Sequence, residues 1–223
     1  MKHMNTLQKI LLLSGLFSSL LYVGLNILCP LFYPGYDSAS QTVSELSAIG
    51  APTRSFWVLI VTFYSLFVIA FGWGILQVAS ENRKLRMVGM LLVINAIIGL
   101  FWPPMHQRVA LAAGEKSLTD ALHIVFTAVT VPMMMVIIGF GAASLGKRFR
   151  NYSIITLAIL VIAGIFTGLQ SPNIDKNLPT PWIGVWERIN IGVYMLWVAV
   201  LSINLVRTEK KYQPTKIIST VHS

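Results

Sequence analysis

The chain has few charged residues and almost no cysteine. Of its 223 residues only 11% are charged and 55% are hydrophobic, whereas soluble domains carry about 25% charged residues. So few charges cannot cover the surface of a water-soluble domain, which excludes that class of protein. The single cysteine, Cys29, excludes an intramolecular disulfide. Internal repeats and low-complexity segments are also missing, so residues 1–223 are expected to form one membrane domain.

Six apolar stretches are long enough to cross a bilayer as α-helices, which takes about 20 residues each. They lie at about 10–29, 55–78, 87–103, 120–145, 152–170 and 182–205. Pro103-Pro104 ends the third stretch, because proline cannot continue a helix. Thr180 and Pro181 suit the cap and the first position of the sixth. The expected fold class is therefore an all-α membrane protein, a bundle of six transmembrane helices.

Basic residues gather on one side of these predicted spans. Twelve of the 17 lysines and arginines share it: Lys2, Lys9, Arg83, Lys84, Arg86, Lys147, Arg148, Arg150, Arg207, Lys210, Lys211 and Lys216. Because cytoplasmic loops carry the excess of lysine and arginine, both termini are predicted to be cytoplasmic. The expected location is the cell (inner) membrane, with multiple passes. The net charge of +9 is then a topology signal, and nucleic-acid binding is not expected.

The first outer loop combines aromatic, acidic and turn-forming residues. Its motifs are Tyr33-Pro34-Gly35-Tyr36-Asp37, Ser44-Glu45-Leu46-Ser47 and Gly50-Ala51-Pro52. Thr42 and Glu45 have the spacing of a capping box, and the glycine and proline that follow are typical of a helix end. The pattern predicts a short helix in this loop. Glu45 either caps that helix or faces a ligand, and the sequence leaves both open.

Two further segments place ionisable side chains near the same membrane boundary. His106 and Arg108 follow Pro103-Pro104, either as interfacial anchors or as ligand groups. Asp120 and His123 are three residues apart and share a face of the predicted helix. A carboxylate beside an imidazole can orient the ring and raise its basicity. A hydrogen-bonded pair between helices is the structural alternative.

Glu187 and Arg188 lie almost two turns inside the sixth predicted span. Ionisable residues within a span are costly and are functional hypotheses by default. Arg188 is placed about 100° around the helix from Glu187, from where its long side chain can reach the headgroups. The structural alternative for Glu187 is a salt bridge to Arg54 or Arg108.

Motifs along nearly the whole chain carry a resemblance to known membrane proteins. They are the three first-loop motifs, Pro103-Pro104 and His123. With them the chain resembles a bacterial group of six-span proteins, the domain of unknown function number nine hundred and ninety-eight. Ser44-Glu45, Pro52, His123 and Glu187 also give a fainter likeness to the eukaryotic damage-regulated autophagy modulators. That likeness implies lipid handling and membrane regulation, and it supplies no catalytic residues.

The expected function is binding of a lipid headgroup or other amphiphile in an outer-facing polar pocket. The candidate ligand-binding residues are Tyr36, Asp37, Ser44, Glu45, Arg54, His106, Arg108, Asp120, His123, Glu187 and Arg188. The arginines would meet phosphate, and the carboxylates would meet an amine or balance the arginines. Membrane lipids are the expected partners. Protein partners are unknown, and an oligomer remains open.

A metal-dependent hydrolase acting on a lipid is the alternative function. Catalytic zinc takes three protein ligands and a water, which His106 and His123 with Asp120 or Glu187 could supply. His123, Asp120 and Glu187 are accordingly the candidate catalytic residues, although no cofactor is expected because no H-E-x-x-H spacing occurs. A serine hydrolase using Ser44 and His123 is weaker, because G-x-S-x-G is absent. An accessory or assembly subunit without a ligand is the further alternative.

Overall fold

The computed structural model describes residues 4–210, and three of the predicted basic residues, Lys2, Lys211 and Lys216, lie outside them. Six long helices dominate: α1 (Thr6–Leu28), α2 (Arg54–Val78), α3 (Arg83–Leu100), α5 (Leu118–Ser144), α6 (Lys147–Gln170) and α7 (Ile183–Lys210). Four short helices join them: η1 (Cys29–Phe32), η2 (Val43–Ser47), α4 (Arg108–Ala112) and η3 (Ser171–Lys176). The prediction of an all-α fold is confirmed for the described residues.

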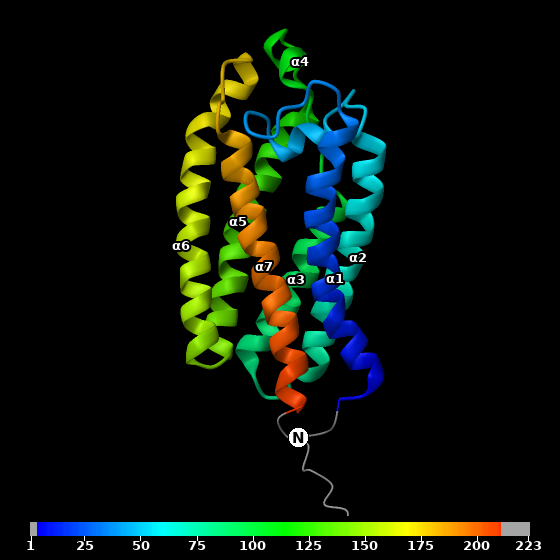
Figure 1. Ribbon diagram of the computed structural model, residues 1–223, viewed down its shortest axis with the longest axis vertical. Coiled ribbons are helices and arrows are strands. Elements are labelled where there is room, and N and C mark those ends of the chain that lie inside the picture. Colours follow the sequence, from blue (N-terminus) through cyan, green and yellow to red (C-terminus); the bar gives the residue numbers. More distant parts are fainter. Residues whose placement is uncertain (1–3, 211–223) are drawn as a thin grey trace, which may run out of the picture.

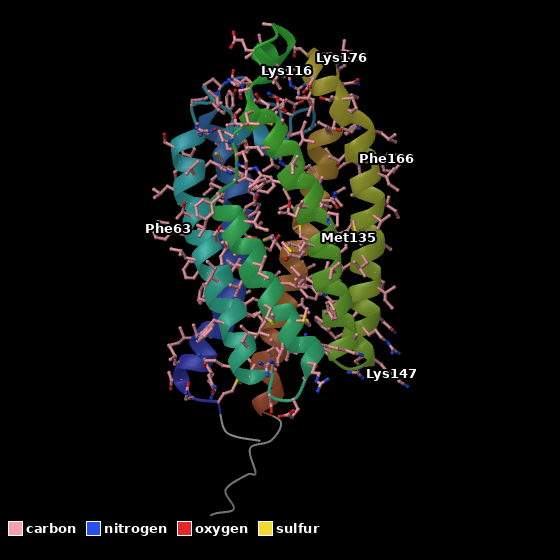
Figure 2. The ribbon with its side chains drawn as sticks, turned by 180° about the vertical axis from the view of Figure 1, so that it is seen from behind. Phe63, Lys116, Met135, Lys147, Phe166 and Lys176 are labelled. Atoms are coloured by element: carbon pink, nitrogen blue, oxygen red, sulfur yellow. The ribbon has the colours of Figure 1, made fainter. Side chains whose placement is uncertain are left out.

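The long helices form a closed ring. Each packs against the next along the chain, from α1 through α2, α3, α5 and α6 to α7, and α7 packs back against α1. The helices run up and down, and both ends of the described chain lie at the same end of the bundle (Figure 1). The short helices η2, α4 and η3 lie at the other end, which we call the loop end (Figure 1). Lys116 and Lys176 lie at the loop end, and Lys147 lies opposite (Figure 2).

The outer surface of the ring is apolar. Phe63 of α2 and Phe166 of α6 point away from the bundle on its two sides (Figure 2). Among the described residues, five helices are long and apolar enough to cross a membrane. Only α3 of the six long helices falls short, because it has 18 residues and carries Arg83, Lys84 and Arg86 in its first turn. The chain is therefore a multi-pass membrane protein with five helices that are long and apolar enough to cross the bilayer.

Small residues let the helices approach closely at the end opposite the loop end. A Cβ on Gly72 of α2 would lie 2.7 Å from the Gly89 carbonyl oxygen of α3, and a Cβ on Gly89 would lie 2.8 Å from the Gly72 carbonyl oxygen. Such contacts are typical of packed membrane helices. Phe71, Ile75 and Trp197 are fully buried in the core beside them. The interior of the ring is therefore filled at this end.

The helix boundaries follow the predicted apolar stretches closely. The third helix ends at Leu100, just before Pro103-Pro104 as expected. The sixth begins at Ile183, so the predicted start at Pro181 is displaced by two residues. Thr180 was expected to cap this helix, but its hydroxyl donates to the Ser40 carbonyl. The short helix predicted in the first outer loop is present as the 3₁₀ helix η2, with the Thr42–Glu45 capping box formed.

Candidate functional site

A cavity of about 340 Å³ lies inside the ring and extends from the loop end. Its mouth is lined by polar side chains and a tryptophan: Ser44, Ser47, Arg54, Glu187 and Trp102. Its deep end is lined by apolar side chains: Val68, Met134, Leu160 and Met195. From Arg54 to Val68 the helix α2 rises about 21 Å. The cavity is therefore elongated along the helices and changes from polar to apolar with depth.

Loop one, residues 33–53, lies across the mouth of this cavity and is anchored by buried charges. The Arg108 guanidinium of α4 donates from Nε to Glu45 Oε1 at 2.7 Å and from Nη2 to Glu45 Oε2 at 2.8 Å. Glu45 is only 2% exposed and also accepts from the Thr42 backbone N–H. Arg108 further donates to the Thr180 hydroxyl. Glu45 thus both caps η2 and joins loop one to α4.

Arg188 anchors the same loop to α7. Its Nη1 donates to the carbonyl oxygens of Ser38 at 2.7 Å and Gln41 at 3.2 Å. Its Nη2 donates to the Tyr36 hydroxyl at 2.7 Å, and that hydroxyl donates to the Thr42 carbonyl at 2.7 Å. Burial raises the pKa of the Tyr36 phenol, so it stays a neutral donor. Arg188 was expected to reach toward the headgroups, and in the structure its guanidinium binds the carbonyl oxygens of loop one.

Glu187 sits beneath loop one and faces the cavity. Its Oε2 accepts from the Val43 backbone N–H at 2.6 Å, so the carboxylate binds the N-terminus of η2. The salt bridge to Arg54 or Arg108 that served as the alternative does not form, because Arg108 pairs with Glu45. Arg54 donates from Nη1 to the Ser47 carbonyl at 2.6 Å and also lines the cavity.

His106 and Asp120 form a pair beside the cavity. Asp120 Oδ2 lies 2.8 Å from His106 Nδ1, and Oδ1 accepts from the His106 backbone N–H at 2.7 Å. Asp120 also accepts from Ser117 in a capping box that opens α5. Asp120 therefore does not orient His123, although the two share a helix face. The pattern Ser117-x-x-Asp120 in the sequence was the available signal that Asp120 would turn back to the helix start.

His123 instead meets Ser44 of loop one. The distance from His123 Nε2 to Ser44 Oγ is 3.1 Å, across 79 residues of sequence. His123 Nδ1 lies 2.8 Å from the Pro103 carbonyl oxygen and 3.1 Å from the indole Nε1 of Trp102. The histidine is buried at 7% exposure, and Ser44 lines the cavity mouth. Through these contacts His123 joins α5 to η2 and to the Pro103-Pro104 segment.

The structure does not bring the metal candidates into one group. His106 pairs with Asp120, His123 with Ser44, and Glu187 with the Val43 backbone. Across residues 4–210, no three side chains of His, Cys, Asp or Glu are grouped so that they could hold a metal ion. The zinc-hydrolase hypothesis therefore gains no ligand set from the fold.

Of the eleven candidate ligand-binding residues, three line the cavity: Ser44, Arg54 and Glu187. Tyr36, Glu45, Arg108 and Arg188 hold loop one in place, and Asp37 is exposed at its tip. The Asp37 carboxylate accepts hydrogen bonds from the Ser40 hydroxyl and the Ala39 backbone N–H, and these bonds hold a tight turn. The same bonds lower the pKa of Asp37.

One polar cavity residue is not among the candidate ligand-binding residues. Asn95 of α3 lines the cavity, and its Oδ1 is buried without a hydrogen-bond partner in the described structure. A buried polar atom of this kind calls for a water or ligand partner. A lone asparagine within an apolar span was the available signal.

A ring of long apolar helices, joined at its loop end by buried charged contacts, defines a polytopic helical membrane protein. A family model described as "Protein of unknown function (DUF998)" matches residues 16–204. The chain belongs to this family, as the loop-one motifs indicated. Neither the comparison with curated proteins nor the comparison with solved structures gives a match.

Proposed function

We propose that this protein is a six-span component of the cell (inner) membrane that binds a lipid or other amphiphile in its ring cavity. The acyl chain occupies the deep apolar end, and the headgroup lies at the polar mouth beneath loop one. The observation that carries the proposal is the shape and polarity of the cavity, which has about 340 Å³ of space. Small-molecule sites have volumes of about 300–1,000 Å³.

The length of the cavity suits one acyl chain. The hydrocarbon core of a bilayer is about 30 Å thick, so a chain in one leaflet spans about 15 Å. The cavity follows α2 over about 21 Å, from Arg54 to Val68. Its walls beyond the mouth are mostly apolar. They include the hydroxyl groups of Thr127 and Thr130, which already donate within their own helix, and one unpartnered polar atom, Asn95 Oδ1. Such walls favour an aliphatic chain over a polar solute.

The mouth offers one cation and one anion. Arg54 carries donors beyond the one bound to the Ser47 carbonyl, and suits a phosphate or carboxylate. Glu187 accepts one backbone hydrogen bond through Oε2 and suits an amine with its other oxygen. The pair therefore favours a zwitterionic or amine-bearing headgroup. Arg108 and Arg188 are committed to loop one and are not headgroup ligands in this proposal.

The six-span topology is supported by the ring itself. If α3 crosses as the other five long helices do, both ends of the chain lie on one side, which agrees with their common position in Figure 1. The basic first turn of α3 then lies at the cytoplasmic boundary, where Arg83, Lys84 and Arg86 are favoured. The loop end is accordingly external.

Native mass spectrometry of the detergent-purified protein tests the binding proposal. Arg54→Gln should reduce retention of co-purified lipid about tenfold or more, because a charge-assisted contact is lost. Arg148→Gln, an exposed arginine at the opposite end, is the matched control and should retain lipid. A wild-type protein that carries no lipid, or an Arg54→Gln variant that retains as much as the control, would favour an accessory subunit without a ligand.

A further inference from the structure

The contact between Ser44 and His123 has the geometry of a nucleophile and its base. Nucleophilic serine requires a general base within about 2.6–3.2 Å, and that base is usually oriented by a third group. Here His123 Nε2 lies 3.1 Å from Ser44 Oγ, and the Pro103 carbonyl lies 2.8 Å from Nδ1. All three come from separate segments of the chain, so the arrangement is a product of the fold and not of local sequence.

The tautomer of His123 decides whether it can act as a base. Nδ1 faces both the Pro103 carbonyl at 2.8 Å and the Trp102 indole N–H at 3.1 Å, and it cannot serve both. A protonated Nδ1 donates to the carbonyl, which is the shorter contact, and leaves the Nε2 lone pair facing the Ser44 hydroxyl. We assign this tautomer. Backbone carbonyls commonly fix histidine in this way.

The position of Ser44 gives the pair access to a substrate. Ser44 lies on η2 at the polar mouth, and the same cavity runs down to apolar walls at Met134 and Met195. A lipid held there would place the ester bonds next to its headgroup at the level of Ser44. Arg54 lines the same mouth, and we assign its positive charge to the stabilisation of the oxyanion.

We propose that Ser44 is an acyl-accepting nucleophile activated by His123, and that an ester-linked lipid in the cavity is its substrate. This inference rests on the binding function proposed above. Ser44 Oγ attacks the ester carbonyl carbon while its proton moves to His123 Nε2. The bond between that carbon and the alkoxy oxygen then breaks, and the proton on Nε2 passes to the departing alcohol. The acyl chain remains as an ester on Ser44.

A water molecule completes the reaction by the same route. It loses a proton to His123 Nε2 and attacks the acyl carbon, and Ser44 Oγ leaves and regains that proton. The net change is ester plus water to carboxylic acid plus alcohol. The Pro103 carbonyl carries no full negative charge, so it stabilises the imidazolium less than a carboxylate does. The reaction is therefore expected to be slow, and covalent capture is the appropriate readout.

The test uses the full-length protein in detergent and two fluorophosphonate probes, one with a long alkyl chain and one with a short chain. Serine displaces fluoride from phosphorus, and peptide mass spectrometry locates the adduct. The long-chain probe should modify Ser44, and faster than the short-chain probe. His123→Gln should slow the modification about 100-fold or more, which is the usual contribution of a general base. Ser55→Ala, an exposed serine of α2, is the control and should react as the wild type.

A second readout uses the wild-type protein alone and is independent of the folding of any variant. Incubation of the wild type with a long-chain p-nitrophenyl ester should add the mass of one acyl group at Ser44. If neither probe nor ester modifies Ser44, or if His123→Gln reacts at the wild-type rate, the contact is only a hydrogen bond between η2 and α5. Lipid retained by a protein with an unreactive Ser44 removes the nucleophile and leaves the binding function. If Ser44 is modified at equal rates by both probes in a protein that retains no lipid, the binding function is removed and the nucleophile remains.

Discussion

Arg108 of α4 binds Glu45 of η2 through two hydrogen bonds, 2.7 and 2.8 Å long, across 63 residues of sequence. The two side chains are 14% and 3% exposed, so the pair is largely withdrawn from water. A bidentate guanidinium–carboxylate pair fixes orientation as well as distance. Loop one and α4 therefore form one lid over the cavity mouth, and that lid is held by charge.

The losses from removing the two partners of this pair should be strongly non-additive. Arg108→Gln or Glu45→Gln should each lower the free energy of unfolding by about 3–5 kcal/mol, because a buried charge loses its partner. The double variant should lose much less than the sum of the two. Thermal unfolding in detergent measures the cycle. Additive losses, within about 0.5 kcal/mol, would mean that the two residues act independently.

Gly184 of α7 is a close-approach position beneath loop one. A Cβ there would overlap the backbone carbonyl oxygens of Ser38 and Gln41, which Arg188 also binds. Gly184→Ala should therefore push loop one away from α7 and increase its cleavage by added protease. Gly192→Ala is the matched control on the same helix, since a Cβ at Gly192 meets nothing within 4 Å. Equal protease resistance of the two variants would contradict close packing of loop one against α7.

The six-span topology predicts which loops are reachable from outside the cell. Cys29 is buried, so single cysteines introduced at exposed sites can be labelled over a low background. Lys116→Cys at the loop end should react with a membrane-impermeant maleimide on intact cells. Lys84→Cys and Lys147→Cys should react only after the membrane is opened. Labelling of Lys84→Cys on intact cells would show that α3 does not cross.

Much of the fold could be predicted from composition and local chemistry. The lengths of the apolar stretches predicted the long helices to within a few residues. A helix in lipid makes its backbone hydrogen bonds within itself, so a sufficiently long apolar stretch is enough to predict it. The capping-box spacing of Thr42 and Glu45 predicted η2, and Pro103-Pro104 predicted the end of α3. These features depend on neighbours along the chain, which the sequence displays directly.

The partners within the site could not be predicted in the same way. Helix periodicity placed Asp120 beside His123, but the Pro103-Pro104 turn brings His106 to Asp120 and leaves His123 to Ser44. The choice depends on how loop one folds across the ring, and that involves residues more than 60 positions apart. The sequence analysis predicted phosphate as the partner of Arg108 and Arg188. Their acceptors in loop one lie far away along the chain, so local sequence could not indicate them.

A pair of glycine variants tests most directly whether the ring cavity holds an acyl chain. Gly99 lines the cavity, where an added Cβ would make only an ordinary contact with Ser65 Oγ at 3.6 Å, so Gly99→Leu should fill the space without displacing a helix. Gly139→Leu is the control, because a Cβ there meets nothing within 4 Å. Native mass spectrometry should show that Gly99→Leu loses bound lipid about tenfold or more while Gly139→Leu retains it. Equal retention by the two variants would contradict the proposal that the cavity is the binding site.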